Sequence, residues 1–216
     1  MHNNFKKGLF ITFEGGEGSG KSTQSKILYE KILKENCSVI YTREPGGSDQ
    51  AESIRNLLVT GDSNRWSPIT ELFLFSAARF DHVEKKIKPA LEKNNIVICD
   101  RYIDSTTAYQ GYAGSINKET INIIQDISTQ NTIPDLTFIL DIDPDIGLKR
   151  SMTESNYETR FENKDLKYHK KIREGYLSIA KENSQRCKIL NANDDINNIS
   201  NKIYTIFQEH LVKAKV

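Results

Sequence analysis

The sequence contains little cysteine: Cys37, Cys99 and Cys187 are its three cysteines, and they lie far apart in 216 residues. An odd number without a CxxC spacing disfavours both a disulfide framework and a structural zinc site. A reducing, cytoplasmic environment fits this usage best. The chain also lacks any apolar run of 18 residues, and its beginning, MHNNFKKGLFITF, has no small-residue cleavage site. We therefore expect no membrane span and no export signal.

An excess of one charge is also missing. Lysine and arginine total 30 and aspartate and glutamate total 29, which gives a formal net charge of +1. This balance disfavours a nucleic-acid-binding surface and an acidic tail, so we expect no nucleic-acid partner. The length suits one α/β domain with a continuous core and is short for two. We predict a single domain over residues 1–216.

Short apolar segments rich in β-branched residues alternate with helix-like segments. The expected strands are residues 8–14, 37–42, 95–100, 136–143 and 187–190. The expected helices are residues 22–34, 51–59, 69–91, 118–128, 145–150 and 165–183. Such alternation predicts an α/β fold, a parallel sheet with helices on both faces. Residues 150–165 are polar and interrupted, which indicates an excursion between helices, either functional or a passive surface loop.

A phosphate-loop motif, GxxxxGK[ST], fits residues 15–22 between an expected strand and an expected helix. The alternative is a glycine-rich turn without a ligand. In a phosphate loop, backbone N–H groups converge on phosphates, a lysine adds charge and a hydroxyl can bind Mg²⁺. The predicted ligand is a nucleoside triphosphate, bound by Gly15, Gly16, Glu17, Gly18, Ser19, Gly20, Lys21, Ser22 and Thr23.

Missing motifs narrow the class of phosphate-loop protein. No aspartate stands three residues before any of the 12 glycines, so a DxxG switch is absent. The NKD at residues 163–165 is not NKxD, because Leu166 holds the last place, and LSGGQ is absent. These absences favour a small phosphotransferase. The alternative is a nucleotide-dependent switch or motor that hydrolyses its nucleotide without a small acceptor.

Arginine is scarce, with 9 arginines against 21 lysines, so each arginine is a candidate for a site that needs a planar fork. Asp100 and Arg101 end an expected strand, at the sheet edge where α/β proteins bind ligands. Asp100 is predicted to hold Mg²⁺ or its water, although a surface Asp–Arg pair would have the same spacing. Phe75 and Arg79 share a helix face and would suit a nucleobase, although ordinary core packing explains the same spacing.

The segments EGGEGSGKST, TREPGGS, LFLFSAAR, CDRYIDSTTAYQG, PDLTFILDI followed by DIGLKR, and RFE are similar to those of bacterial thymidylate kinase (dTMP kinase), in the same order. The resemblance covers nearly the whole chain. It implies a P-loop NTPase three-layer fold with a five-stranded parallel sheet, and a homodimer. It also implies that ATP and dTMP are converted to ADP and dTDP with Mg²⁺, in dTTP biosynthesis for DNA synthesis.

The resemblance also implies residue roles. Phe75 would stack on thymine, Arg79 read its edge, and Arg101 grip the dTMP phosphate. Tyr109 would pack where a ribose 2′-hydroxyl would clash, and Glu17 would bind the 3′-hydroxyl. The full implied dTMP site is Glu17, Arg43, Pro45, Phe75, Arg79, Arg101, Ser105, Thr106, Tyr109 and Gln110, with Ser22 and Asp100 at the metal. Residues 191–195 stand where the family has its adenine loop.

Residues 16–19 of the phosphate loop contain no arginine, so the resemblance implies that basic groups come from a lid at about residues 149–163. The predicted catalytic residues are Lys21, Arg101, Arg150 and Arg160. The lid has fewer basic residues than many relatives, and Thr159 replaces a common acid, so Arg150 and Arg160 both remain candidates for the phosphates. A kinase for dUMP or another monophosphate is the alternative within this class, because thymine differs from uracil by one methyl group.

The acceptor phosphate of dTMP is mostly dianionic at neutral pH, because the second pKa of a phosphate monoester is near 6. The reaction therefore needs no general base, and we predict structural or surface roles for the four histidines, which are His2, His82, His169 and His210.

Overall fold

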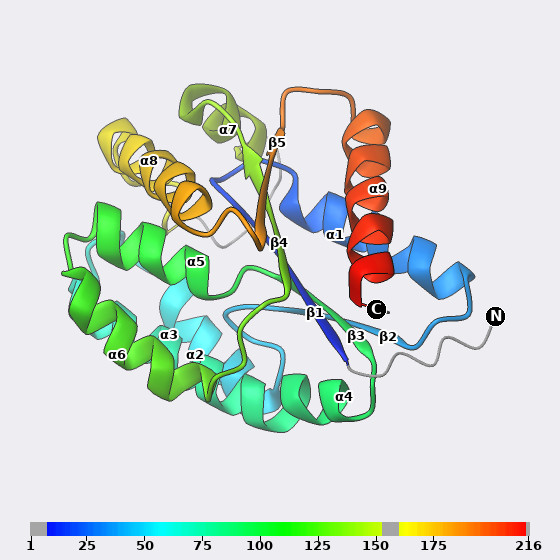
Figure 1. Ribbon diagram of the computed structural model, residues 1–216. Coiled ribbons are helices and arrows are strands. Elements are labelled where there is room, and N and C mark those ends of the chain that lie inside the picture. The colour runs from blue at the N-terminus through cyan, green and yellow to red at the C-terminus, as the bar shows by residue number, and fades with distance from the viewer. Residues whose placement is uncertain (1–7, 153–159, 215–216) are drawn as a thin grey trace.

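The sheet is central to the computed structural model, which describes residues 8–152 and 160–214. Five parallel strands follow the order β2-β3-β1-β4-β5 (Figure 1). Their bounds are β1 Leu9–Gly15, β2 Val39–Arg43, β3 Ile96–Asp100, β4 Leu136–Asp141 and β5 Cys187–Asn191. The predicted α/β fold with a five-stranded parallel sheet is confirmed. In the register, Phe13 of β1 pairs with Asp100 of β3, so the ends of these two strands meet at one edge.

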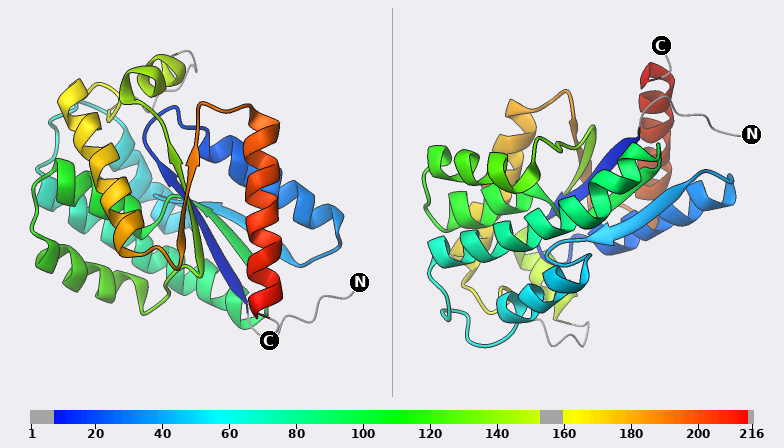
Figure 2. Two further views of the ribbon diagram at one scale, coloured as in Figure 1. Left: turned by 45° about the horizontal axis from the view of Figure 1, so that its top comes forward. Right: turned by 90° about the horizontal axis from the view of Figure 1, so that it is seen from below.

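Helices cover both faces of the sheet (Figures 1 and 2). On one face lie α1 (Lys21–Lys34) and α9 (Ile196–Ala214). The helices of the other face are α3 Pro68–His82, α4 Lys88–Glu92, α5 Ile103–Thr106, α6 Lys118–Thr129 and α8 Leu166–Glu182. Two π-helical segments, Val83–Ile87 and Thr107–Ala113, continue α3 and α5. Two further helices, α2 (Asp49–Val59) beside α3 and α7 (Pro144–Ser151) after β4, complete the described elements.

Alternation along β1 divides the core between the two faces. Leu9, Ile11 and Phe13 are buried with α1 and α9, whereas Phe10 packs on the other side against Tyr102, with ring centroids 4.9 Å apart. Both faces of the strand are therefore apolar, which explains its continuous hydrophobic run. This packing fixes the carboxyl ends of β1 and β3, where the phosphate loop and Arg101 begin.

Some predicted boundaries differ from the observed ones. Residues 69–91 are helical almost throughout, but a π-helical turn separates α3 from α4. Strand β4 ends at Asp141 and not at residue 143, because the Asp143 side chain caps α7 by accepting a hydrogen bond from the Asp145 N–H at 2.9 Å. The helices at residues 103–113 and 196–214 were not predicted.

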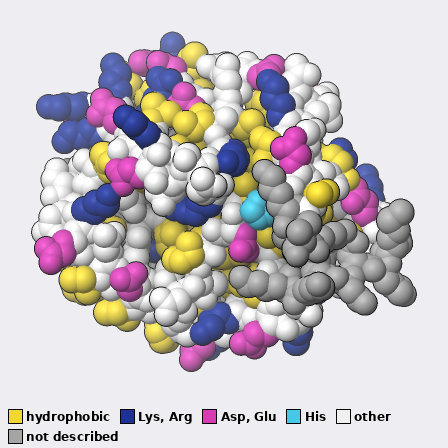
Figure 3. Space-filling model, in the orientation of Figure 1, with side chains coloured by type: hydrophobic (Ala, Val, Ile, Leu, Met, Phe, Trp, Pro, Cys, Tyr) yellow, Lys and Arg dark blue, Asp and Glu magenta, His cyan; other side chains and the backbone are white. Residues whose placement is uncertain are grey.

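The surface agrees with the balanced composition. Basic and acidic side chains are interspersed over the face seen in Figure 3. Among the described helices, none has the length and apolar character needed to cross a membrane.

Candidate active site

The phosphate loop joins β1 to α1 and depends on glycine for its shape. Gly15, Gly18 and Gly20 have φ values of 142°, 63° and 85°, in the region that side chains disfavour. Gly18 also touches α7: a Cβ atom on Gly18 would lie 2.0 Å from the carbonyl oxygen of Gly147. The loop and α7 therefore pack backbone to backbone.

Lys21 begins α1 at the end of this loop. Its Nζ donates hydrogen bonds to the carbonyl of Gly16 at 2.7 Å and to Ser19 Oγ at 3.3 Å. Burial, with repulsion from Arg101, lowers the pKa of Lys21 to about 8, although Glu17 and Asp100 oppose the shift. A polyanion at the loop would favour the charged lysine, because an opposite charge raises an amine pKa. The helix N-terminus and Lys21 together suit a phosphate chain.

Ser22 and Asp100, the two residues predicted to hold the metal, are in contact beside the loop. Ser22 Oγ donates to Asp100 Oδ2 at 2.5 Å. Hydroxyl and carboxylate oxygens suit Mg²⁺, which usually keeps only one or two protein ligands and completes its shell with phosphate oxygens and water. The described residues include no cluster of three His, Cys, Asp or Glu side chains that could hold a metal.

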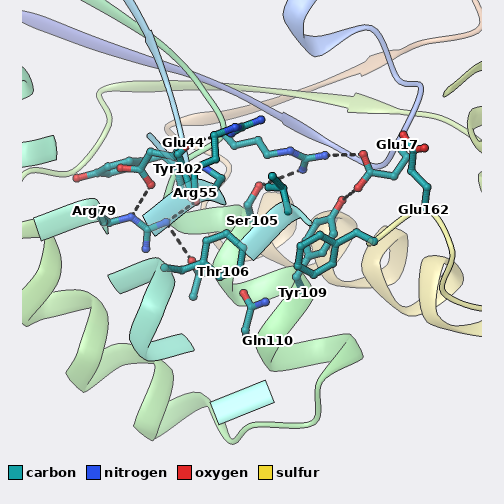
Figure 4. Close-up of a pocket in the computed structure, with 15 residues that line it drawn as sticks. Glu17, Glu44, Arg55, Arg79, Tyr102, Ser105, Thr106, Tyr109, Gln110 and Glu162 are labelled. Atoms are coloured by element: carbon teal, nitrogen blue, oxygen red, sulfur yellow. Dashed lines mark hydrogen bonds and ion pairs between the residues drawn. The ribbon is translucent and has the colours of Figure 1, made fainter. Parts of the chain in front are cut away.

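A second pocket, of about 130 Å³, opens next to the phosphate loop (Figure 4). All the predicted dTMP residues except Arg43 line it. They are Glu17, Pro45, Phe75, Arg79, Arg101, Ser105, Thr106, Tyr109 and Gln110. The side chain of Arg43 is half exposed and instead pairs with Glu52 at 3.2 Å. The structure thus brings together residues from segments that lie far apart in the sequence.

Six lining residues were not predicted: Glu44, Arg55, Val59, Tyr102, Phe161 and Glu162. The scarcity of arginine was a usable signal for Arg55, which donates to the carbonyl of Pro45 at 2.6 Å. Glu44 lies inside the TREPGGS segment, and Phe161 and Glu162 lie inside RFE. Tyr102 lies inside CDRYIDSTTAYQG, whereas Val59 gave no signal that separates it from ordinary core residues.

Glu17 connects the phosphate loop to this pocket. Its carboxylate accepts from Arg101 Nη2 at 2.9 Å and from the Tyr109 hydroxyl at 2.5 Å (Figure 4). Burial alone would raise the pKa of Glu17. Arg101, Lys21 and the Tyr109 hydrogen bond outweigh burial and lower the pKa to about 2. Glu17 is therefore an ionised carboxylate at neutral pH, stabilised by the charges of Arg101 and Lys21.

Arg101 is fixed from several sides. Its backbone has φ 67°, a left-handed conformation that is uncommon for a residue with a side chain. Nη1 donates to the carbonyl of Gly15 at 3.0 Å, and the next residue, Tyr102, donates its N–H to buried Glu14 at 2.7 Å. Burial, with repulsion from Asp104, raises the pKa of Glu14 to about 7. Glu14 thus holds the backbone directly after Arg101 in place.

Arg79 is almost completely buried, with 2% of its surface exposed. Nε donates to Glu44 at 2.8 Å, and Nη2 donates to the Tyr102 carbonyl at 3.1 Å and to Thr106 Oγ1 at 3.0 Å. Nη1 has no hydrogen-bond partner among the described residues. His82 helps to position the carboxylate of Glu44, because its Nδ1 lies 3.1 Å from Glu44 Oε1. A pocket-lining arginine is thus held rigidly, and the two N–H donors of its Nη1 are left without a protein acceptor among the described residues.

The two candidate lid arginines have different surroundings. Arg150, exposed near the end of α7, donates to the carbonyl of Ala192 at 2.9 Å, inside the predicted adenine loop. Arg160 is 1% exposed and pairs with Glu71 at 2.5 Å. It also donates to the carbonyl of Leu58, near the end of α2, and to that of Asp62, in the connection between α2 and α3. Residues 153–159 of the predicted lid, including Thr159, lie outside the described residues.

The same connection between α2 and α3 contains Trp66, the one tryptophan of the chain. Its indole Nε1 donates to the carbonyl of Leu57 at 3.0 Å, next to the carbonyl of Leu58 that binds Arg160. Arg160 and Trp66 therefore hold adjacent peptide groups at the end of α2.

A phosphate loop facing a rigid pocket that can bind a second, phosphorylated molecule places the protein in the class of P-loop nucleoside monophosphate kinases. Comparison with known proteins agrees and is more specific. The thymidylate kinase family model matches residues 13–203. The chain belongs to the thymidylate kinase family.

Individual relatives support this membership over nearly the full length. The thymidylate kinase of Caulobacter vibrioides is 43% identical, covering 95% of this chain and 98% of that protein. The thymidylate kinase of Chlamydia abortus is 44% identical, covering 96% of this chain and 99% of that protein. The crystal structure of thymidylate kinase from Ehrlichia chaffeensis superposes with a TM-score of 0.76 at 38% identity, over 93% of this chain and 98% of that one.

Proposed function

We propose that the protein transfers the terminal phosphoryl group of ATP to dTMP, giving ADP and dTDP, with Mg²⁺ as cofactor. The product would feed dTTP synthesis for DNA replication. One observation carries the proposal: the phosphate loop and the second pocket meet at the Glu17–Arg101 pair, so two nucleotides can be bound with their phosphates facing each other.

The chemistry needs positive charge and alignment more than proton transfer, since a phosphate dianion is already nucleophilic. Lys21 would bind the donor phosphates, and Arg101 would hold the acceptor phosphate between the two nucleotides. Ser22 and Asp100 would hold Mg²⁺, which supplies charge neutralisation on the phosphate oxygens. Of the two lid arginines, Arg150 is the better candidate for the phosphates, because each side-chain nitrogen of Arg160 donates to a protein acceptor.

The pocket suits a deoxyribonucleotide. Phe75 offers a ring for stacking, and Arg79 offers its remaining Nη1 donor to the base edge. Tyr109 is held by Glu17 at 2.5 Å and would lie against the sugar, where it leaves little room for a 2′-hydroxyl. Ser105, Thr106, Gln110 and Pro45 line the same space, and Arg43 would act from the loop beside the acceptor.

The assembly and setting of the protein are part of the same proposal. We propose one domain with a lid at about residues 149–163, acting in the cytoplasm as a homodimer. An apolar surface on two neighbouring helices supports the dimer. It consists of Ile69, Phe73 and Phe80 on α3 and Ile123 and Ile127 on α6, each at least 40% exposed. Burying such a surface against a second copy would remove apolar area from water.

The test is ADP release from Mg-ATP, measured with each common ribo- and deoxyribonucleoside monophosphate as acceptor. A preference for dTMP is expected. Consumption of ATP that does not depend on any monophosphate would instead favour a nucleotide-hydrolysing switch. Equal use of dUMP would move the proposal to a broader pyrimidine kinase, because one methyl group is worth only about 1–3 kcal/mol in an apolar pocket.

A further inference from the structure

Glu71 lies outside the pocket but touches two of the parts that shape it. It is in the first turn of α3 and is 5% exposed. Oε2 accepts a hydrogen bond from Gln110 Nε2 at 3.1 Å, and Oε1 accepts one from Arg160 Nη2 at 2.5 Å. A single buried carboxylate therefore joins a pocket-lining amide to the segment at residues 160–162.

This contact determines which way the Gln110 amide points. An ionised carboxylate beside a guanidinium can only accept hydrogen bonds, so it must face the NH₂ group of Gln110. The carbonyl Oε1 of Gln110 is left without a protein partner among the described residues, and Gln110 lines the pocket. In Figure 4 this side chain points toward Thr106 and Tyr109. Glu71 thus presents a fixed acceptor to the ligand.

The acceptor lies in the same pocket as Arg79, whose buried Nη1 has no hydrogen-bond partner among the described residues. A donor and an acceptor held together complement a base edge with a carbonyl oxygen next to a ring N–H, as in thymine and uracil. Cytosine offers an amino donor and an unprotonated ring nitrogen at the same positions, so both contacts would be mismatched. If the Gln110 amide were rotated by half a turn, it would present a donor in place of its carbonyl oxygen, and one of the two selective contacts would be lost.

The contact between Glu71 and Arg160 also positions aromatic side chains that line the pocket. The next residue, Phe161, packs against Phe75 with ring centroids 6.1 Å apart and against Tyr109 at 5.7 Å. The bonds from Arg160 to Glu71 and to the carbonyl of Leu58 hold this ring over the pocket. Glu71 therefore supports both the hydrogen-bonding edge and the apolar wall of one site.

We propose that Glu71 is a positioning residue that sets the base selectivity of the acceptor site by orienting the amide of Gln110. The proposal rests on the function proposed above, and it extends that function to a residue that does not touch the substrate.

The test compares Glu71→Asp and Glu71→Gln with Gln110→Ala and the double variant Glu71→Asp/Gln110→Ala. Glu71→Asp keeps the negative charge beside Arg160 but is one methylene shorter and cannot reach both partners. Glu71→Gln removes the charge that fixes the amide orientation. Glu84→Asp, on an exposed side chain, is the matched control. For each variant, KM and kcat are measured with dTMP and dCMP, with KM for ATP and the thermal unfolding midpoint.

The expected result for Glu71→Asp is a roughly tenfold rise in KM for dTMP and a roughly tenfold fall in the dTMP-to-dCMP ratio of kcat/KM, the size of one lost hydrogen bond to a buried group. The dTMP kcat and the KM for ATP should change less than about twofold. In the Gln110→Ala background, Glu71→Asp should leave the ratio unchanged, because no amide remains to be oriented.

An unchanged dTMP-to-dCMP ratio of kcat/KM in folded Glu71→Asp would overturn the proposal. An equally large fall in this ratio when Glu71→Asp is added to Gln110→Ala would overturn it as well. If Glu71→Gln fails to fold because Arg160 is left buried and unpaired, the charge-conserving Glu71→Asp variant decides. Measurements on the wild-type protein distinguish failure of the proposed function from failure of this inference. If the wild-type protein shows no dTMP-dependent ADP release, the proposed function is contradicted. If it prefers dTMP and Glu71→Asp has the same preference, only this inference is contradicted.

Discussion

Glu17 and Arg101 are 84 residues apart in the chain and form an ion pair of 2.9 Å where the phosphate loop meets the second pocket. The pair answers why a loop built for phosphates contains an acid. The carboxylate is neutralised by Arg101 and Lys21, so it costs the loop little repulsion. It also links the element that would hold ATP to the arginine that would hold dTMP.

Replacing Glu17 with glutamine should therefore impair acceptor use more than donor binding. We expect kcat/KM for dTMP to fall roughly 10- to 100-fold, because a charge-assisted hydrogen bond is lost. The KM for ATP should change less than about twofold. Steady-state kinetics with each substrate varied in turn measure both values. Glu30→Gln on the exposed side of α1 is the control, and equal losses for the two substrates would contradict the coupling role.

Removing the guanidinium of Arg101 should affect the chemical step. We expect Arg101→Ala to lower kcat for dTMP by about 10³-fold, in the range found for arginines that stabilise phosphoryl transfer. Arg65→Ala removes an exposed arginine outside the pocket and should leave kcat unchanged. Wild-type turnover in Arg101→Ala would remove Arg101 from the catalytic residues.

Arg150 and Arg160 should respond in opposite ways to substitution. Arg160→Ala leaves Glu71 buried without its partner, so the free energy of unfolding should fall by about 3–5 kcal/mol. Arg150 is exposed, so Arg150→Ala should keep the stability and lower kcat. Urea unfolding and single-turnover kinetics on both variants separate these effects. Full activity in Arg150→Ala would leave the phosphate-binding role to another group.

Glu14 should make stability depend on pH. Burial raises its pKa from the ordinary 4.5 to about 7, so the folded protein holds this proton more tightly than the unfolded chain. The contribution is present below pH 4.5 and is lost as pH rises through about 7, with a size of up to about 3 kcal/mol. Glu14→Gln should flatten this part of the profile. Urea unfolding between pH 5 and about 8 measures it, and parallel wild-type and variant profiles would argue against the assignment.

The apolar surface on α3 and α6 predicts the assembly. Phe73 is 58% exposed, and a charge at its place would be costly inside an interface between two copies. We expect Phe73→Asp to convert a dimer to a monomer in sedimentation velocity experiments. Leu33→Asp places the same charge on an exposed apolar position of α1 and should keep the dimer. A monomeric wild-type protein would exclude the proposed homodimer.

The sequence predicted the sheet from local signals, whereas most of the residues that line the pocket were named by the resemblance to thymidylate kinase. Apolar β-branched segments marked all five strands, and the phosphate loop lies where its motif places it. Arg101, directly after β3, and Arg79, on α3, were informative positions because lysine is more than twice as common as arginine in this chain. These features are visible in one stretch of chain at a time.

Features that depend on distant partners could not be predicted in this way. Arg160 was one of two candidates for the phosphates, and its partners Glu71 and Leu58, which are 89 and 102 residues away, could not be read from the sequence. Arg43 follows the expected strand, yet its side chain turns to Glu52 and not to the pocket. α9 was not predicted, and it begins at Ile196, directly after the residues 191–195 that were assigned to the adenine loop. In each case tertiary contacts determine the outcome.

The position of Trp66 gives the protein an intrinsic optical label. It is the one tryptophan in the chain, and its indole is bonded to the peptide group beside the one that binds Arg160. Its emission spectrum can therefore follow any rearrangement of the Arg160–Phe161 segment as nucleotides are added, without an attached dye. Stopped-flow fluorescence of the unmodified protein would then time that motion directly against phosphoryl transfer.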